Sequence, residues 1–206
     1  MLLAAKIQPP QSVFAHGFFT IDGVKMSKSL GNVISPVELG DTFGNDALRV
    51  GLLSSFEFGN DGDFSVQSFS DFYRTRLAGG VGNLFNRVIT LIHKFMEGQK
   101  PQVSLDTKVL EKFEAKMEAK EIKAAIEIFF EVTSAANQLL SDTEVWKLAK
   151  TDLEQAKKIF AQLLGKLEIL TEMAQVILPE TAPKMQRMLG SQTQVGQAQI
   201  LFPALK

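Results

Sequence analysis

Residues 77–96 read LAGGVGNLFNRVITLIHKFM, and this stretch decides the fold class of the chain. On a helix that turns by about 100° per residue, its large apolar side chains gather on one broad face. That face consists of Leu77, Val81, Leu84, Phe85, Val88, Leu91, Ile92 and Phe95. The opposite side collects the polar residues Asn83, Asn86, Arg87, Thr90 and Lys94. The stretch therefore predicts an amphipathic helix that buries one stripe and presents a second, hydrogen-bonding stripe to solvent.

Helical patterns continue beyond this stretch. Ser65 is positioned to cap the long helix, which we expect to run from there to about Met96. Further helices are expected from about 104 to 120, 121 to 140, 151 to 178 and 182 to 189. The helix that begins near Thr151 starts with a capping box, Thr151-Asp152-Leu153-Glu154. We therefore expect a mainly α protein whose body is a bundle of about five helices.

Residues 1–64 show a different pattern. Two short runs rich in aromatic and β-branched residues flank Asp22-Gly23, a dipeptide typical of hairpin turns. The capping box Ser35-Pro36-Val37-Glu38 opens a short helix. A second helix is expected over 46–54, with Leu48, Leu52 and Leu53 as its buried side chains. We therefore divide the chain into a small mixed α/β segment, residues 1–64, and a helical domain, residues 65–206.

The composition excludes several classes of protein and of site. Hydrophobic residues make up 45% and charged residues 22% of the 206 residues, as in ordinary globular domains. Because the net charge is −1, any contact with nucleic acid must be a local patch rather than a global basic field. The chain has no cysteine and only two histidines, so we expect neither a disulfide nor a metal site. No apolar run reaches the roughly 18 residues of a membrane span, so we expect a cytoplasmic protein without membrane contact.

A basic loop precedes the first expected helix. Residues 22–36 read DGVKMSKSLGNVISP and place Lys25 and Lys28 among serines and glycines. Lysine ammonium groups, serine hydroxyls and the amides next to glycines can together hold a chain of phosphates. The G-x-x-x-x-G-K-[S/T] spacing of the common phosphate-binding loop is absent. On these residues alone, the loop is either a phosphate site or a solvated basic turn.

The pentapeptide Lys25-Met26-Ser27-Lys28-Ser29 matches, letter for letter, the KMSKS signature loop of class I aminoacyl-tRNA synthetases. The pentapeptide alone does not tell the methionine enzymes from those for leucine, valine, isoleucine or cysteine. The strings around it and beyond it resemble methionyl-tRNA synthetases: FAHGFFTIDGVKMSKSLGNVISPVEL, FGNDALRVGLL, FEFGNDGDFS and GNLFNR. This resemblance covers nearly the whole chain, and together the strings favour methionine.

The resemblance implies that the loop closes over ATP in a parent enzyme that activates methionine and transfers it to tRNA. Lys28, the second lysine of the signature, would stabilise the phosphate charge while the methionine carboxylate attacks the α-phosphorus. Lys25 would be a secondary contact in an ATP-binding loop that spans residues 25–29. ATP with Mg²⁺, and methionine, are therefore expected as ligands of the parent enzyme. No ligand is expected to bind tightly to this chain alone.

The family reads the CAU anticodon of its tRNA with the C-terminal helical bundle. The resemblance assigns an Asn-x-x-x-Arg pair to Asn83 and Arg87, which lie one turn apart on the polar stripe. It assigns a base-stacking tryptophan to Trp146, in a polar stretch between two expected helices, and the usual preceding proline is replaced by Val145. Without the resemblance, a solvated helix face and a tryptophan core anchor remain open alternatives.

Two parts of the family are missing from this sequence. It contains neither the nucleotide-binding sheet with a His-Ile-Gly-His-type motif nor a cysteine-based zinc knuckle. We therefore expect a C-terminal fragment without methionine-dependent ATP–pyrophosphate exchange. Residues 1–64 would be the end of the catalytic domain with its stem-contact segment, and residues 65–206 the anticodon-binding domain. The alternatives are a stand-alone tRNA-binding or scaffold module and a fragment of another class I synthetase.

Overall fold

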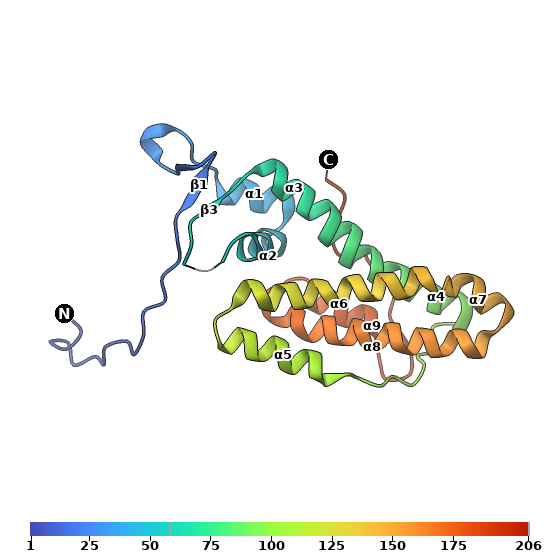
Figure 1. Cartoon of the computed structure of the whole chain (residues 1–206). Coiled ribbons are helices and arrows are strands. Elements are labelled where there is room, and N and C mark those ends of the chain that lie inside the picture. The colour runs from blue at the N-terminus through green and yellow to red at the C-terminus, as the bar shows by residue number, and fades with distance from the viewer. Residues whose placement is uncertain (58, 206) are drawn as a thin grey trace.

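The computed structural model describes residues 1–57 and 59–205 and is mainly helical (Figure 1). Its N-terminal part contains β1 (Phe19–Ile21), β2 (Val24–Lys25), α1 (Pro36–Phe43), α2 (Asn45–Ser55) and β3 (Gly62–Asp63). Its helical part contains α3 (Val66–Phe72), α4 (Asn83–Met96), α5 (Thr107–Glu118), α6 (Ile122–Asp142), α7 (Val145–Thr151), α8 (Leu153–Ile177) and α9 (Ala182–Leu189). The predicted fold class is confirmed, and α7 is a short addition to the five helices expected in the bundle.

The long helix predicted from 65 to 96 is continuous, but its middle is a π-helix. Residues Tyr73–Gly82 join α3 to α4 in this wider form, in which each amide bonds to the carbonyl five residues back. The glycines permit it. A Cβ on Gly79 would lie 2.8 Å from the Arg74 carbonyl oxygen, and one on Gly80 would lie 3.2 Å from that of Thr75. The glycines therefore allow these two carbonyl oxygens to lie close to the helix backbone, where a side chain at residue 79 or 80 would collide with them.

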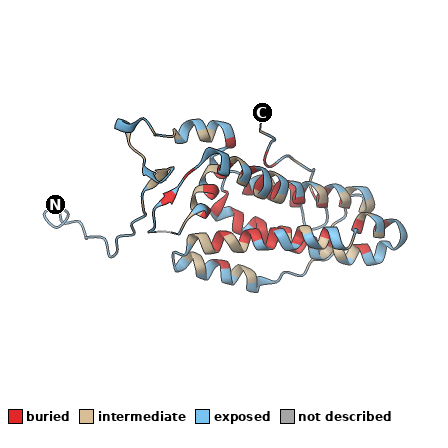
Figure 2. Cartoon of the chain, turned by 45° about the horizontal axis from the view of Figure 1, so that its top comes forward, coloured by how far each residue is buried: buried red, intermediate tan, exposed pale blue. Residues whose placement is uncertain are grey.

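The core is built around α8, which packs against α4, α6, α7 and α9. Figure 2 shows the buried residues on the facing sides of these helices. Phe85 of α4, Phe129 of α6 and Phe160 of α8 are fully buried there. Truncation of such a phenylalanine typically costs about 3–5 kcal/mol. The core thus holds α4 and α7 against the same helix.

Among the described residues no helix is long and apolar enough to cross a membrane.

Two expectations about helix faces and caps are wrong. Helix α2 buries Ala47, Val50 and Gly51, whereas the leucines expected in the core are only half-buried. The side chain of Phe69 packs against Gly51, where a Cβ would lie 2.2 Å from its ring, so this face of α2 approaches α3 closely. Helix α8 is capped by Asp152 and not by Thr151, because the Asp152 carboxylate accepts a 2.9 Å hydrogen bond from the Gln155 amide. Aspartate caps a helix at least as well as threonine, so the capping-box pattern alone did not determine which of the two residues precedes the helix.

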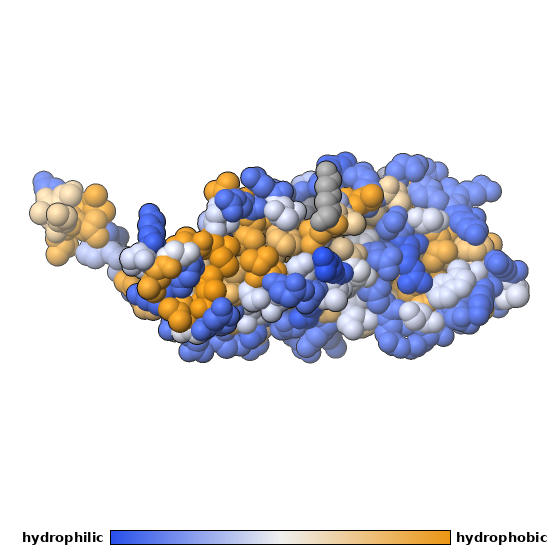
Figure 3. Space-filling model, turned by 90° about the horizontal axis from the view of Figure 1, so that it is seen from above, coloured by the Kyte–Doolittle hydropathy of each residue, from blue (hydrophilic) through white to orange (hydrophobic). Residues whose placement is uncertain are grey.

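The N-terminal part differs from the bundle in its surface. An extended segment leads away from the body before β1 (Figure 1). Large apolar side chains are exposed along the first 40 residues, including Val13, Phe14, Phe18, Val24, Leu30, Val33 and Val37. In Figure 3 apolar surface gathers at this end of the molecule. Contiguous apolar surface of this kind marks an interaction face more often than a free surface.

Candidate functional site

A β-hairpin presents the signature loop. Strands β1 and β2 pair antiparallel with Thr20 opposite Lys25. The two residues between them, Asp22 and Gly23, both have positive φ, 53° and 74°, as a two-residue hairpin turn of type I′ requires. The predicted turn is confirmed. Strand β3 adds to the other edge of β1 in parallel, with Thr20 opposite Asp63.

The signature loop itself forms a compact turn rather than an open coil. The Asn32 side chain accepts a 2.8 Å hydrogen bond from the Ser27 amide, and the Ser27 and Ser29 hydroxyls lie 2.8 Å apart. A short 3₁₀ turn, Lys28–Leu30, ends at Gly31 with φ 69°. These contacts between the serines and Asn32 fold the loop. The side chains of Lys25 and Lys28 take no part in them.

The two lysines of the loop lie differently. The Lys25 ammonium lies 3.6 Å from the centroid of the Phe18 ring, which is a cation–π contact. Lys28 is exposed, and among the described residues it takes part in no ion pair. Met26 donates its amide to the Phe19 carbonyl at 3.0 Å and so continues the hairpin ladder. Lys25 is thus partly held by the protein, while Lys28 offers a free charge.

Asp63 ties β3 to the hairpin turn that leads into this loop. Its carboxylate accepts hydrogen bonds from the Gly23 amide at 2.9 Å and from the Thr20 hydroxyl at 2.7 Å. The bond from the Gly23 amide has the larger effect and the bond from the Thr20 hydroxyl the smaller one, and together they hold the pKa of Asp63 below its ordinary value of 3.8. Both bonds stabilise the charged form. The contribution to stability is therefore present above the pKa of the unfolded chain and lost as the pH falls through the folded value.

The hydrogen bond between the Asp63 carboxylate and the Gly23 amide predicts that this amide senses the titration of Asp63 in acid. We expect the NMR shift of the Gly23 amide to titrate with a midpoint below 3.8. The change Thr20→Val, which removes one donor, should raise that midpoint. The Gly31 amide bonds to the Lys28 carbonyl instead, so it serves as the control and should not follow the titration. A Gly23 midpoint at or above the ordinary aspartate value would contradict the link.

The polar stripe of α4 faces α7. The Arg87 guanidinium carbon lies 5.4 Å from the centroid of the Trp146 ring. A cleft of about 350 Å³ opens beside this pair. It is lined by Asn86, Arg87, Thr90, Leu91 and Trp146. The structure thus brings together Arg87 and Trp146, which the sequence places 59 positions apart, and leaves Asn83 exposed at the first position of α4, outside the cleft lining.

Trp146 lies in helix α7, so its expected position in an irregular polar stretch is wrong. The helix begins at Val145, which is fully buried, after Glu144 with φ 40°. Val145 therefore anchors the start of α7 in the core, while the next residue, Trp146, stays half-buried at the surface.

Asn137 of α6 has a structural partner at the π-helix. Its amide donates to the Thr133 carbonyl at 3.1 Å and to the Gly80 carbonyl at 3.4 Å. The wider helix changes the bonding of its carbonyls, and Asn137 supplies a donor to one of them. This amide thus connects α6 to the segment that leads into α4.

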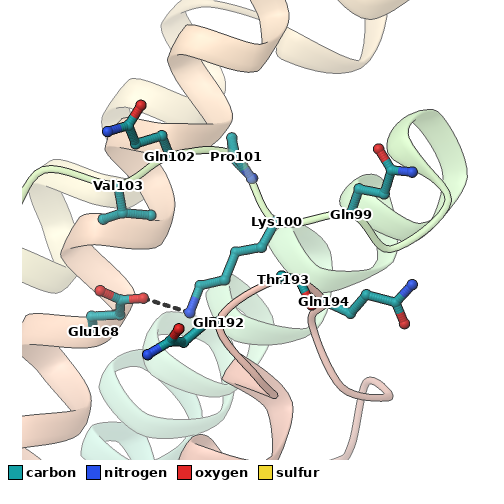
Figure 4. A pocket seen from close by; sticks show the side chains of 9 residues that line it. All are labelled: Gln99, Lys100, Pro101, Gln102, Val103, Glu168, Gln192, Thr193 and Gln194. Atoms are coloured by element: carbon teal, nitrogen blue, oxygen red, sulfur yellow. Dashed lines mark ion pairs between the residues drawn. The ribbon is translucent and has the colours of Figure 1, made fainter.

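A larger polar cavity lies elsewhere in the bundle (Figure 4). It measures about 680 Å³ and is lined by Gln99, Lys100, Pro101, Gln102, Val103, Glu168, Gln192, Thr193 and Gln194. The Lys100 ammonium and the Glu168 carboxylate form a 2.6 Å ion pair across it, so the wall carries little net charge. The sequence analysis did not single out these residues. Within the described residues, no cluster of histidine, aspartate or glutamate could hold a metal ion.

Two family models match the chain along nearly its whole length. Residues 1–89 match the class I tRNA synthetases (M), and residues 97–200 match the anticodon binding domain of methionyl tRNA ligase. The chain belongs to the methionyl-tRNA synthetase family. The resemblance inferred from the KMSKS loop and its flanking strings is thereby confirmed.

The individual relatives agree. A methionine–tRNA ligase of Synechocystis is 33% identical over 203 residues, which is 92% of this chain and 38% of that protein. A chloroplastic/mitochondrial methionine–tRNA ligase of Arabidopsis thaliana is 35% identical and covers 93% of this chain and 33% of that protein. The methionyl-tRNA synthetase of Mycobacterium tuberculosis, solved in complex with methionyl-adenylate, superposes with a TM-score of 0.84 at 28% identity. The match covers 98% of this chain and 46% of the M. tuberculosis chain. This methionyl-tRNA synthetase chain thus spans less than half the length of the relatives that it matches.

Proposed function

We propose that the chain works within a methionine–tRNA ligase, which activates methionine with ATP and transfers it to tRNA in the cytoplasm. In this proposal residues 1–64 are the end of the catalytic domain with its stem-contact segment, and residues 65–206 are the anticodon-binding domain. The family assignment supports it, as does the methionyl-adenylate bound to a relative of the same fold. The exposed apolar surface of the first 40 residues is consistent with an N-terminal part that packs against more protein.

For the loop of residues 25–29, we propose a role in charge stabilisation. Lys28 is exposed and takes part in no ion pair among the described residues, and we propose that its ammonium group approaches the phosphates of ATP with Mg²⁺ as negative charge builds up during methionine activation. Lys25, held near Phe18, is a secondary contact. Met26 is tied to the hairpin, and Ser27 and Ser29 fold the loop behind the lysines. In this arrangement the serines position the cation and no side chain of the loop transfers a proton.

For the bundle, we propose recognition of the CAU anticodon by Asn83, Arg87 and Trp146. The contact of the Arg87 guanidinium with the Trp146 ring beside a cleft is the single observation that carries this proposal. An indole ring and a guanidinium plane are the surfaces on which unpaired RNA bases stack. Asn83 adds an exposed amide one turn before Arg87 on the same helix. Unpaired loop bases are recognised by stacking together with hydrogen bonds to their edges, and this set of residues supplies both.

A titration with anticodon stem–loops tests the proposal. We expect the 206-residue chain to bind a CAU stem–loop at least about tenfold more tightly than loops that differ only in the anticodon, a difference of about 1.4 kcal/mol. Fluorescence anisotropy at fixed salt measures the affinities, because phosphate contacts make the absolute values depend on salt. Equal affinity for every loop would favour a non-specific RNA-binding module. A preference for the anticodon of another amino acid would favour another class I synthetase.

A further inference from the structure

The cleft beside Trp146 contains two polar side chains that are not among the three anticodon residues above. Asn86 and Thr90 of α4 line it together with Arg87, Leu91 and Trp146. Its volume of about 350 Å³ lies at the lower end of the range for small-ligand clefts, ~300–1,000 Å³. A cleft of this size suits one unpaired base better than a longer stretch of RNA.

The lining of the cleft includes side chains suited to stacking and side chains suited to hydrogen bonding. The Trp146 ring and the Arg87 guanidinium are of the first kind. Asn86 and Thr90, one helical turn apart on α4, are of the second kind. The Thr90 hydroxyl donates a long hydrogen bond of 3.5 Å to Asn86 Oδ1. Within the part of the chain that the structure describes, no hydrogen bond engages Asn86 Nδ2, so the donor side of this amide is available at the cleft.

Asn83 is placed differently from Asn86. It lies three residues earlier on α4, and on a helix this rotates it by about 60° from Asn86 in projection. It does not line the cleft. Its exposed amide therefore lies outside the cleft, so a base held beside Trp146 would need another residue to read its edge.

We propose that Asn86 reads the edge of the anticodon base that occupies this cleft, and that Thr90 is a positioning residue that orients the Asn86 amide. A side-chain amide carries a donor and an acceptor side by side, and asparagine uses this pair against base edges. Trp146 and Arg87 then hold the base by one of its faces, which every base has, while Asn86 selects among bases. This inference rests on the proposed anticodon recognition and assigns its selectivity to a residue.

The test uses four labelled stem–loops: CAU and three loops with a single change, one at each anticodon position. In wild-type chain, the ratio of each affinity to that for CAU gives the preference at each position. The change Asn86→Ala should reduce the preference about tenfold at one position and leave the other two within about twofold, because a paired amide contact supplies discrimination of this size. Thr90→Val should cause a smaller reduction at the same position, and Thr90→Ser should restore it.

The outcomes separate this inference from the proposed function. Gln138→Ala is the matched control, because Gln138 is an exposed amide on α6 that bonds to Asp142 and does not line the cleft. If the wild-type chain prefers CAU and Asn86→Ala keeps every preference within about twofold, the role of Asn86 is wrong and the proposed function stands. A reduction spread evenly over all three positions would also overturn the role of Asn86. A wild-type chain that binds all four loops equally would overturn the proposed function, and with it the role of Asn86.

Discussion

Replacement of Trp146 by alanine should lower the affinity for a CAU stem–loop by about 5- to 150-fold, because stacking on an aromatic side chain is worth about 1–3 kcal/mol per base. Trp146 is only half-buried, and it lies at the cleft against Arg87 rather than within the core. We therefore expect the fold to survive the change. Anisotropy titrations at fixed salt measure the affinity, and thermal melting followed by circular dichroism measures the fold.

Two further variants make this result decisive. Trp146→Phe keeps an aromatic face and should recover most of the affinity. Val145→Ala removes a fully buried neighbour in the same helix. It should lower the melting temperature, while the affinity of the folded chain for the stem–loop should change little. If Trp146→Ala instead melts the chain and the remaining folded fraction binds normally, the tryptophan is a core anchor and the stacking role is wrong.

Replacement of Asp46 by alanine should destabilise the chain by about 2 kcal/mol, a typical value for a hydrogen bond to a charged group. Asp46 is buried in α2, and its carboxylate accepts a 2.6 Å hydrogen bond from the Thr181 amide at the start of α9. The first amides of a helix lack partners within the helix, and they carry the positive end of its dipole. Asp46 thus joins the N-terminal part to α9, the last helix of the chain.

Thermal melting tests this join. For a chain of this size, about 2 kcal/mol corresponds to a fall of about 4–8 °C in melting temperature. Asp46→Asn keeps an acceptor and should lose less than Asp46→Ala. Asp41→Ala, at an exposed position of α1, is the control and should change little. Equal melting temperatures for wild type and Asp46→Ala would show that α9 is fixed by other contacts.

Local signals in the sequence predicted much of this structure. Asp22-Gly23 gave the hairpin turn, and the Ser35 and Ser65 hydroxyls cap α1 and α3 as expected. The apolar period of residues 77–96 predicted most of the buried face of the long helix, although it omitted Ile89, and Leu91 and Phe95 are only half-buried. Each of these features depends on residues a few positions apart. The hydrogen bonds and side-chain periods that define them can therefore be inferred from a short window of sequence.

The features that the sequence analysis missed depend on contacts between distant segments. The partner of the Asp46 carboxylate is the Thr181 amide, 135 positions away in the sequence. Helix α7 has only seven residues, too few to show a helical period. Trp146 was found through the family resemblance, but the cleft that it shares with Asn86 and Thr90 exists only because α4 and α7 pack on the same core. The polar stripe contained Asn86, but nothing in it separated Asn86 from its neighbours.

The π-helix of Tyr73–Gly82 sets the angular phase between the two halves of the long helix. Each residue added to or removed from a helix rotates everything beyond it by about 100°. Because the apolar face of α4 is buried in the core, Arg87 faces Trp146 only while this phase is kept. The same residues in a strictly α-helical form would accumulate a different rotation over Tyr73–Gly82, and would present another face of α4 to the core. The glycines that permit the wider turns therefore help to determine which side chains of α4 reach the surface beside α7.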